Sequence, residues 1–470
     1  MSKARMRGGD YLALLAVALL TLIGILAETA LNVTYPELAQ VFQISLDITQ
    51  WLTAGYLLMV TIMMGTTAYL LKRFPAKRLQ LVAALLFIGG DVGSALAMNF
   101  PVLMVSRLLQ AMATGLSTPM FFHLIFTLVP REKLGAMTGV AGMVISFAPA
   151  LGPTYGGWLA TVWSWRAIFW FVLPVALISL WLGQRFITTI PAKQSAQSAH
   201  FNLASFLALA LAMFTWIYAL SMIGRFGFTG LFYWLLVLAL ALYGFFIYLN
   251  FRGATPLVDL RIFQHLAVSL DGLTYFCLQF INIGLSLVIP IYAQYTLHAS
   301  AFISGAILLP GTLVGAVMSP LAGALADRVG FAVPVIGGSC LLTLGAAGFF
   351  FGQAQLTVLK MTLLFVVLRA GFNMAFANTI SNASTHVALQ NTADVSSLFN
   401  MLQQLAGATG VVFLASLMAL FENQGTGTMA MRTYAGGRID FGLTFSLALI
   451  VFGTALVNYH FQAHRSAQTE

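Results

Sequence analysis

The stretch GVAGMVISFAPALGPTYGG, residues 139–157, lies inside a long apolar run and decides the fold. Small residues recur in it at four-residue intervals, at Ala148, Gly152 and Gly156. Residues at this spacing share one face of a helix, so that face consists almost only of backbone. Pro149 and Pro153 each remove a helix hydrogen bond and bend the axis. Because small residues let membrane helices approach closely, we expect a bent membrane helix in movable contact with a neighbour.

The composition excludes a water-soluble protein. The chain has 470 residues, of which 60% are hydrophobic and only 7% charged, and its mean hydropathy is +0.91. So few charges cannot cover the surface of a soluble domain of this length. Apolar runs of about 20 residues match the ~30 Å hydrocarbon core of a bilayer, whereas barrel strands alternate over about ten residues. The sequence therefore predicts an all-α integral membrane protein.

Hydropathy and breaker residues predict about fourteen spans, roughly at 11–33, 50–71, 80–99, 101–128, 135–160, 165–187, 201–222, 230–250, 266–296, 301–325, 332–352, 357–380, 395–420 and 440–461. With a cytoplasmic N-terminus, fifteen Lys and Arg fall in inner segments and five in outer ones. The positive-inside rule then predicts a multi-pass protein of the inner, or cytoplasmic, cell membrane with both termini in the cytoplasm. The positive-inside rule also explains the net charge of +9, because most of the Lys and Arg residues lie in inner segments. We therefore expect no nucleic-acid partner.

A weak internal repeat divides the chain. Residues 103–119, LMVSRLLQAMATGLSTP, resemble residues 364–380, LFVVLRAGFNMAFANTI, in an early Arg followed by small residues. Two similar halves of six spans with an extra pair between them are typical of transporters. We expect a six-helix bundle over 1–190, a linker with two extra helices over 191–262, and a second six-helix bundle over 263–470.

Several motifs occur in one order along the chain. They are Ala27 to Asn32 followed by Pro36, Arg107 with Gln110, Gly152-Pro153 with Gly156-Gly157, Trp165-Arg166 with Phe169, and Gly323 with Asp327, Arg328 and Gly330. Together they resemble the major facilitator superfamily, and more closely its fourteen-span drug:proton antiporter branch, the EmrB/QacA type. The resemblance implies the major facilitator fold, with the fifth-span stretch Ala148 to Gly157 as the antiporter motif. The chain departs from the family pattern at Lys72, Pro75 and Ala111, so the first of the two loop motifs is incomplete.

Five charged residues lie clearly within the predicted spans: Glu28, Asp91, Arg107, Asp271 and Arg369. An intramembrane charge costs about 2.5–3.5 kcal/mol on insertion scales, so such residues face a cavity, pair with one another or titrate. Glu28 lies beside Thr29 and Asn32 and can hold either a proton or a cationic ligand. The structural alternative is a Glu28 neutralised by Arg107.

The other charged residues have two interpretations each. Asp91 with Arg107 forms either a structural ion pair or part of a proton relay. Asp271 is a second cation site or an interfacial, partly hydrated acid. Arg369 resembles Arg107 by repeat position, and its alternative is to extend toward the outer surface.

Two further groups of candidates surround these charges. The first is a gating loop in which the resemblance assigns Asp327 and Arg328 to a charge clamp framed by Gly323 and Gly330; the alternative is an ordinary helix-end charge pair. The second comprises candidate cavity residues, namely Asn32, Trp51, Tyr56 and Phe147. Aromatic faces attract organic cations, although any one of these rings can equally serve packing.

These features predict a proton-coupled antiporter that exports lipophilic, cationic drugs or toxic compounds by alternating access. An exporter of a specific metabolite, such as an amino acid, a siderophore or a lipid precursor, remains the alternative on the same fold. A membrane-embedded transferase is a remote alternative, because no two acids lie within five residues of each other as a metal or pyrophosphate site needs. Expected partners are the substrate, protons and the lipid bilayer, without a cofactor or metal; a monomer is one option.

Overall fold

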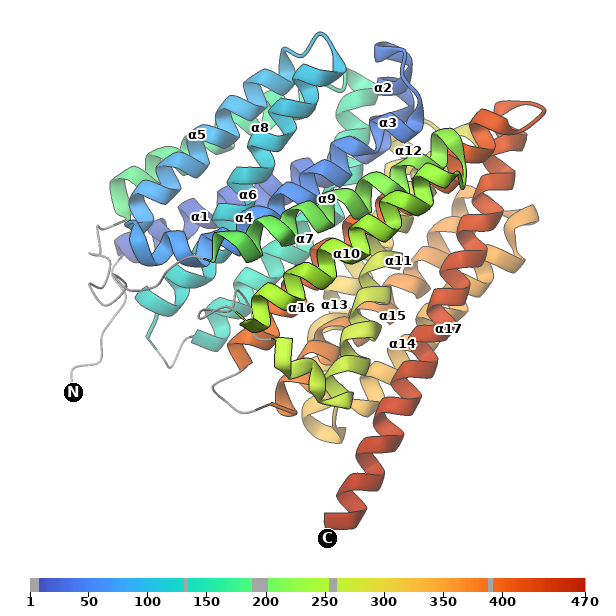
Figure 1. Cartoon of the computed structure of the whole chain (residues 1–470). Coiled ribbons are helices and arrows are strands. Elements are labelled where there is room, and N and C mark those ends of the chain that lie inside the picture. The colour runs from blue at the N-terminus through green and yellow to red at the C-terminus, as the bar shows by residue number, and fades with distance from the viewer. Residues whose placement is uncertain (1–7, 131–133, 188–201, 253–259, 388–391, 470) are drawn as a thin grey trace, which may run out of the picture. The chain divides into compact units, whose positions relative to one another are not determined.

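The computed structural model describes residues 8–130, 134–187, 202–252, 260–387 and 392–469. Every regular element within these ranges is a helix, and most of the helices are long rods (Figure 1). The expectation of an all-α membrane fold is therefore confirmed.

Twelve helices of the described residues are long and apolar enough to cross a membrane. Two further long helices stand where the second and fifth spans are expected, namely α4 (Trp51–Arg73), whose apolar part is Trp51–Thr67, and α7 (Leu134–Val162). This arrangement is compatible with the expected count of about fourteen. Helix α7 continues through both Pro149 and Pro153.

The chain divides into two compact units, and the first comprises residues 1–44 and 51–203. Besides α4 and α7, its helices are α1 (Gly8–Ala30), η1 (Leu31–Thr34), α2 (Tyr35–Phe42), α5 (Ala76–Ala95), α6 (Phe100–Leu128) and α8 (Ala167–Phe186). Helix α6 begins with an ordinary cap, since the side chain of Asn99 accepts a hydrogen bond from the backbone N–H of Val102 at 3.0 Å.

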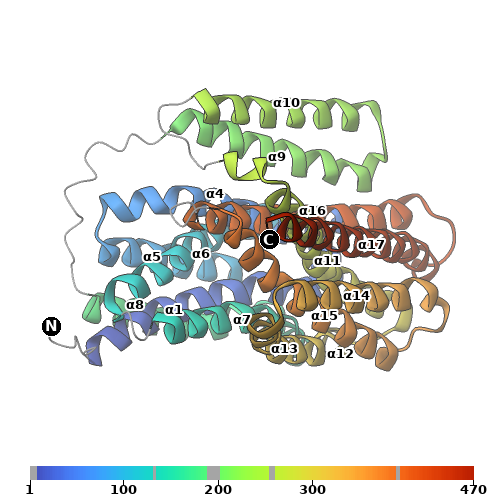
Figure 2. The same cartoon turned by 90° about the horizontal axis from the view of Figure 1, so that it is seen from below.

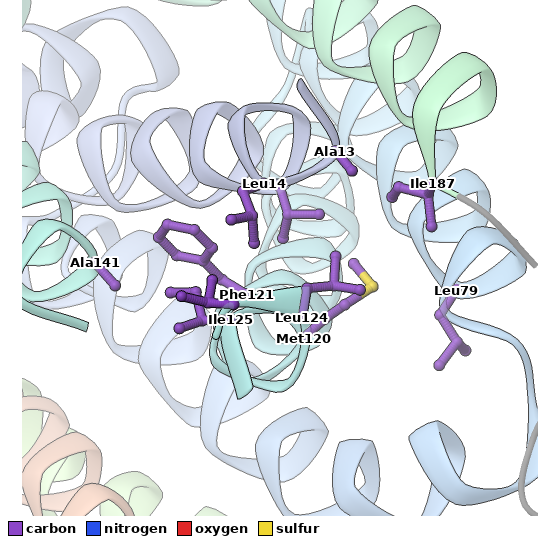
Figure 3. Packing of buried hydrophobic residues seen from close by; sticks show 11 residues of the cluster. Ala13, Leu14, Leu79, Met120, Phe121, Leu124, Ile125, Ala141 and Ile187 are labelled. Carbon is purple, nitrogen blue, oxygen red and sulfur yellow. The ribbon is translucent and has the colours of Figure 1, made fainter. Parts of the chain in front are cut away.

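Apolar side chains of several helices fill the interior of the first unit (Figure 3). Leu14 of α1 lies against Phe121, Leu124 and Ile125 of α6, and Ala141 of α7 borders the same cluster. All five side chains are at most 3% exposed. Other faces of these helices expose apolar side chains such as Leu15, Val105 and Trp158, as expected where helices meet lipid rather than water.

The second unit comprises residues 45–50 and 204–470. Its helices are α3 (Leu46–Thr49), α9 (Leu203–Phe226), α10 (Gly230–Arg252), η4 (Leu260–Gln264), α11 (Leu266–Leu297), α12 (Ala301–Ala306), α13 (Leu308–Val329), α14 (Ala332–Phe351), η5 (Gln353–Gln355), α15 (Val358–Thr385), α16 (Thr392–Gln424) and α17 (Met429–Thr469).

Helices α9 and α10, the pair expected as a linker, group with this second unit and lie side by side at its edge (Figure 2). Two hydrogen bonds join α9 to α16. The indole N–H of Trp216 donates to the Thr409 hydroxyl at 3.1 Å, and the Asn423 amide donates to the carbonyl of Gly224 at 3.0 Å. Most of the large apolar side chains of α10 are exposed, which suits a helix that faces lipid.

One segment expected as a loop consists largely of the adjoining ends of two helices. The predicted spans 395–420 and 440–461 leave residues 421–439 as a loop between them, but α16 runs to Gln424 and α17 begins at Met429. The guanidinium of Arg432 donates to the backbone carbonyl of Glu422 at 2.6 Å, which ties the two helix ends together. Gly436 and Gly437 lie within α17, where they allow close contact with Met418 and Tyr292.

Candidate functional site

Glu28 lies in the last turn of α1, where the chain continues through η1 into α2. Its side chain is 6% exposed, and its carboxyl accepts no side-chain hydrogen bond from the described part of the chain. Arg107 of α6 interacts with it electrostatically without a direct hydrogen bond. The carboxyl is therefore buried but not held in place by a partner.

The residues that follow Glu28 pack against the glycine stripe of α7. A Cβ atom on Gly152 would overlap the Thr29 hydroxyl and would lie 3.0 Å from the carbonyl oxygen of Leu26. A Cβ atom on Gly156 would overlap the carbonyl oxygen of Ala30. The neighbour of the stripe is thus α1, and the contact joins the backbones of α7 and α1 directly beside Glu28.

The rest of the fifth-span motif supports the same contact. Ala148, Pro153 and Gly157 are buried, and Pro149 is half-buried. Tyr155, also on α7, donates its hydroxyl to the carbonyl of Ile168 on α8 at 2.9 Å. Helix α7 is therefore held to α8 by a hydrogen bond and to α1 by close backbone packing.

Arg107, Gln110 and Asp91 form a continuous polar chain. The Arg107 guanidinium donates from Nη1 to the Gln110 amide oxygen at 2.7 Å. The Gln110 amide nitrogen in turn donates to Oδ1 of Asp91 on α5. All three side chains are at most 1% exposed. The predicted pairing of Asp91 with Arg107 is therefore indirect, because an amide stands between the two charges.

Within the described part of the protein, three charge-bearing atoms of these side chains have no hydrogen-bond partner: Nε and Nη2 of Arg107 and Oδ2 of Asp91. The Arg107 guanidinium carbon lies 4.4 Å from the centre of the Tyr56 ring, which provides cation–π stabilisation. Arg107 also interacts electrostatically with both Glu28 and Asp91. One buried cation therefore faces two buried acids.

Hydroxyl groups from α2, α4 and α6 surround this charge cluster. The Tyr56 hydroxyl donates to the carbonyl of Gly24 at 2.9 Å and lies 2.6 Å from the Thr114 hydroxyl. The Thr53 hydroxyl donates to the side-chain oxygen of Asn32 at 2.7 Å and is in hydrogen-bond contact with Tyr35. Asn32 and Tyr56, expected as cavity residues, therefore each belong to a small group of hydrogen-bonded side chains.

Asp271 of α11 is bound by two amides in the second unit. Its oxygens accept hydrogen bonds from Asn382 of α15 at 2.7 Å and Asn458 of α17 at 2.8 Å. The residue is 2% exposed, which contradicts the alternative of a partly hydrated interfacial acid. The hydrogen bonds bring three helices together, because Asp271 lies on the inward face of α11 rather than toward the membrane surface.

Arg369 of α15 is buried rather than extended toward a surface, with 8% of its side chain exposed. Its guanidinium donates to the amide oxygen of Asn282 on α11, whose nitrogen donates to Gln279. Like Arg107, it therefore binds an amide, which agrees with the expected repeat. Among the residues described, its Nε has no hydrogen-bond partner, and no acid acts on it electrostatically.

The remaining predicted residues lie at helix ends or near the surface. Asp327 and Arg328 are exposed at the end of α13, which Gly330 terminates with a φ of +82°. Gly323 has open space where a Cβ would stand. Phe147 is 38% exposed, and Trp51 is half-buried at the start of α4. Their roles in gating or in a cavity stay predictions.

Sequence reasoning missed two features of the site. It did not identify the bridging role of Gln110, although the amide stands three residues after Arg107 and hence one helical turn away. It also missed Glu422 and Asp440, which fell in or beside the expected loop and are buried in α16 and α17. Among the residues that the structure describes, no three His, Cys, Asp or Glu side chains gather as metal ligands would.

Comparisons with known proteins agree with this architecture. The family model described as Major Facilitator Superfamily matches residues 17–411. The lincomycin resistance protein LmrB of Listeria innocua is 30% identical over 441 residues, which cover 92% of each chain. A multidrug resistance protein B homolog of Mycobacterium tuberculosis is 30% identical over 376 residues, or 78% of this chain and 68% of that protein.

Among solved structures, a crystal structure of the peptide transporter POT matches with a TM-score of 0.70 at 16% identity and covers 97% of each chain. At this identity the likeness concerns the fold alone. The helical architecture, the family match and the relatives together show a multi-pass membrane protein. The chain belongs to the Major Facilitator Superfamily, and it is a transporter of small substrates rather than an enzyme.

Proposed function

We propose that this transporter exports lipophilic, cationic drugs or other toxic compounds from the cell in exchange for protons. The observation that carries the proposal is the position of the Glu28 carboxyl. It is buried, accepts no side-chain hydrogen bond from the described residues and lies beside the α1–α7 backbone contact. The names of the relatives support a drug as the substrate, since one is a lincomycin resistance protein and another a multidrug resistance homolog. Their identities of 30% support the substrate class rather than a particular drug.

Charge balance supports exchange of a proton for a cation. Arg107 carries one positive charge and faces two acids, Glu28 and Asp91. The cluster is neutral when one acid is protonated and the other ionised. When that proton leaves, the cluster carries one uncompensated negative charge in a region of low dielectric, which a cationic substrate can balance. The proton and the cationic substrate then exclude each other from the cluster, as antiport requires.

Glu28 is the acid that we assign to exchange, because its surroundings differ from those of Asp91. Asp91 receives a hydrogen bond from Gln110 and is 1% exposed. Glu28 has no such donor in the described region and lies on the helix that α7 contacts. We expect alternating access by movement of two six-helix bundles, with both termini in the cytoplasm and a monomer as the working unit.

The test uses inside-out membrane vesicles that contain the full-length transporter. With the proposed orientation, acidifying the vesicle lumen drives uptake of a fluorescent lipophilic cation. Glu28→Gln keeps the shape of the side chain but cannot exchange a proton, so this variant should fold, insert and lose proton-driven uptake. Glu37→Gln is the matched control, since Glu37 is a half-buried acid nine residues further along that does not face Arg107. Wild-type uptake by Glu28→Gln would remove Glu28 from the coupling role.

One observation favours a second candidate, an exporter of a specific metabolite. The Arg369 guanidinium is buried and binds an amide oxygen rather than an acid of the described chain. A metabolite that carries a carboxylate, such as an amino acid or a siderophore, could supply the missing negative charge. Competition between the fluorescent cation and a panel of carboxylate metabolites separates the two candidates. Inhibition by one metabolite alone, lost in Arg369→Gln, would favour the metabolite exporter.

A further inference from the structure

The adjoining ends of α16 and α17 hold two buried acids that the proposed exchange site does not use. Glu422 lies two residues before the end of α16 and is 5% exposed. Its Oε1 accepts a hydrogen bond from the Thr433 hydroxyl at 2.8 Å. Asp440 of α17 is fully buried, and neither of its carboxyl oxygens has a hydrogen-bond partner among the residues that the structure describes. The two acids interact electrostatically, so a charge on one opposes a charge on the other.

The packing of α17 places Asp440 between two other helices. Gly436, one turn earlier, packs against Met418 of α16, and Gly437 packs against Tyr292 of α11. On a helical wheel with about 100° per residue, Asp440 falls between these two glycines. Phe441, the next residue, contacts Tyr292 and Phe349 of α14 through their rings. The carboxyl is thus surrounded by α11, α16 and aromatic side chains.

The polar and charged groups near Asp440 form hydrogen bonds with atoms other than its carboxyl oxygens. The Thr444 hydroxyl, one turn later, donates to the backbone carbonyls of Asp440 at 3.0 Å and Phe441 at 2.9 Å. Arg432 donates to the backbone of Glu422. Among groups on the elements packed against α17, α11 presents Tyr292 and, toward Glu422, Tyr295, and α16 presents Glu422. Helix α14 presents phenylalanine rings and Thr343, which donates to the carbonyl of Ala448 at 3.0 Å, and Gln353 of η5 donates to the carbonyl of Tyr434 at 2.8 Å.

A comparison with Asp271 shows why a structural role does not explain Asp440. Asp271 accepts hydrogen bonds from two amides and so joins three helices. Asp440 joins no helices in this way, because no described residue hydrogen-bonds either of its carboxyl oxygens. An apolar side chain would satisfy the same packing without burying an unpaired polar group. What the carboxyl adds is the capacity to bind and release a proton.

We infer that Asp440 is a proton-binding site of the second unit and that Glu422 links it to the α16–α17 connection. Asp440 stands eleven residues after the start of α17 at Met429. At about 1.5 Å per residue it lies roughly 16 Å along the helix from Met429. Glu422 lies near the connected ends of α16 and α17, so the two acids mark a route from that connection into the helix bundle. A proton needs only the carboxyl itself, whereas a metal ion needs several oxygen ligands.

The first experiment detects the proton directly, independently of transport. Infrared difference spectra of the purified full-length transporter in lipid are recorded while the pH is stepped from acidic to alkaline. We expect a C=O band of a protonated carboxyl that disappears with rising pH and is absent in Asp440→Asn. Thr444→Val is the matched control, because it changes the adjacent turn and should keep the band. Should Asp440→Asn fold poorly, Glu422→Gln serves in its place and should change the pH at which the band disappears.

Two results would overturn the inference. One is an Asp440 band that persists at every pH, which would make the residue a permanently neutral packing group. The other is a band that responds to sodium ions at constant pH, which would replace the proton with a metal ion. A titrating band that is lost in Asp440→Asn and kept in Thr444→Val supports the inference.

The transport experiment rests on the proposed proton coupling and separates the two proposals. In the vesicle assay we expect Asp440→Asn to lower the number of protons moved per substrate, while Thr444→Val leaves it unchanged. If Glu28→Gln still couples and Asp440→Asn does not, the role of Glu28 fails and that of Asp440 stands. If Asp440→Asn keeps the wild-type proton number and pH dependence while Glu28→Gln loses coupling, the inference for Asp440 fails and the proposed function stands.

Discussion

Gly156→Ala tests the backbone contact between α7 and α1 with the smallest possible change. The added methyl carbon would overlap the carbonyl oxygen of Ala30 and lie 2.7 Å from its carbonyl carbon and 3.0 Å from its Cα. Non-bonded carbon atoms prefer a separation of about 3.5–4.0 Å, so the two helices must move apart by roughly 1 Å. No rotamer change can relieve the overlap, since both sides of the contact are backbone.

The expected cost follows from that displacement. A gap of about 0.5–1 Å forfeits roughly a quarter to a half of the dispersion attraction along the contact, and overpacking of a tight interior costs about 1–3 kcal/mol. For a unit of this size, about 1 kcal/mol corresponds to roughly 2–4 °C in melting temperature. We therefore expect Gly156→Ala to lower the melting temperature by roughly 5 °C, measured by intrinsic tryptophan fluorescence of the purified protein.

Gly89→Ala provides the matched control, because a Cβ at Gly89 of α5 meets nothing within 4 Å. The same methyl group there should leave melting unchanged or raise it slightly, since Ala favours a helix over Gly by up to about 1 kcal/mol. Transport should fall in Gly156→Ala and not in Gly89→Ala. Equal melting temperatures and equal transport in the two variants would refute the claim that α7 and α1 touch through their backbones.

Three further changes have expected outcomes. Gln110→Leu leaves both Arg107 Nη1 and Asp91 Oδ1 without their partner, so we expect the free energy of unfolding, measured by thermal melting, to fall by about 3 kcal/mol. An unchanged melting curve would contradict the polar chain. Asp440→Leu removes a buried polar group that no described residue hydrogen-bonds and should stabilise the protein by about 1–3 kcal/mol, whereas a lower melting temperature would reveal a native partner. Gly152→Val forces a branched side chain against α1 and should abolish uptake in vesicles, so wild-type turnover would show that the contact does not matter for transport.

The long helices could be predicted from the sequence because a bilayer imposes one simple rule on them. Runs of about 20 apolar residues are needed to cross the hydrocarbon core, and each such run stands out against polar connections. The prediction was wrong for one segment whose composition is typical of a loop. Residues 425–439 contain four glycines and two arginines and were expected as a loop, yet only 425–428 connect the helices. Close contacts at Gly436 and Gly437 and the Arg432–Glu422 hydrogen bond explain why the helix forms there.

The candidate site could be predicted only in its charged members. Glu28, Asp91 and Arg107 stand out because charge is costly in a membrane wherever it occurs. Their partners are ordinary polar residues whose importance depends on which helices adjoin. Gln110 bridges Arg107 and Asp91 because α5 and α6 pack together, and Asn458 reaches Asp271 from a helix 187 residues away in the chain. Likewise the glycine stripe predicts a close neighbour but does not name α1.

The contact between α7 and α1 has a mechanical consequence. Side chains absorb small displacements by changing rotamer, but two backbones in contact have no rotamers to change. A shift of α7 at Gly152 and Gly156 must therefore be transmitted to Thr29 and Ala30 almost without loss. The adjoining Glu28 carboxyl would move with them relative to α6, so its distance from Arg107 follows the position of α7.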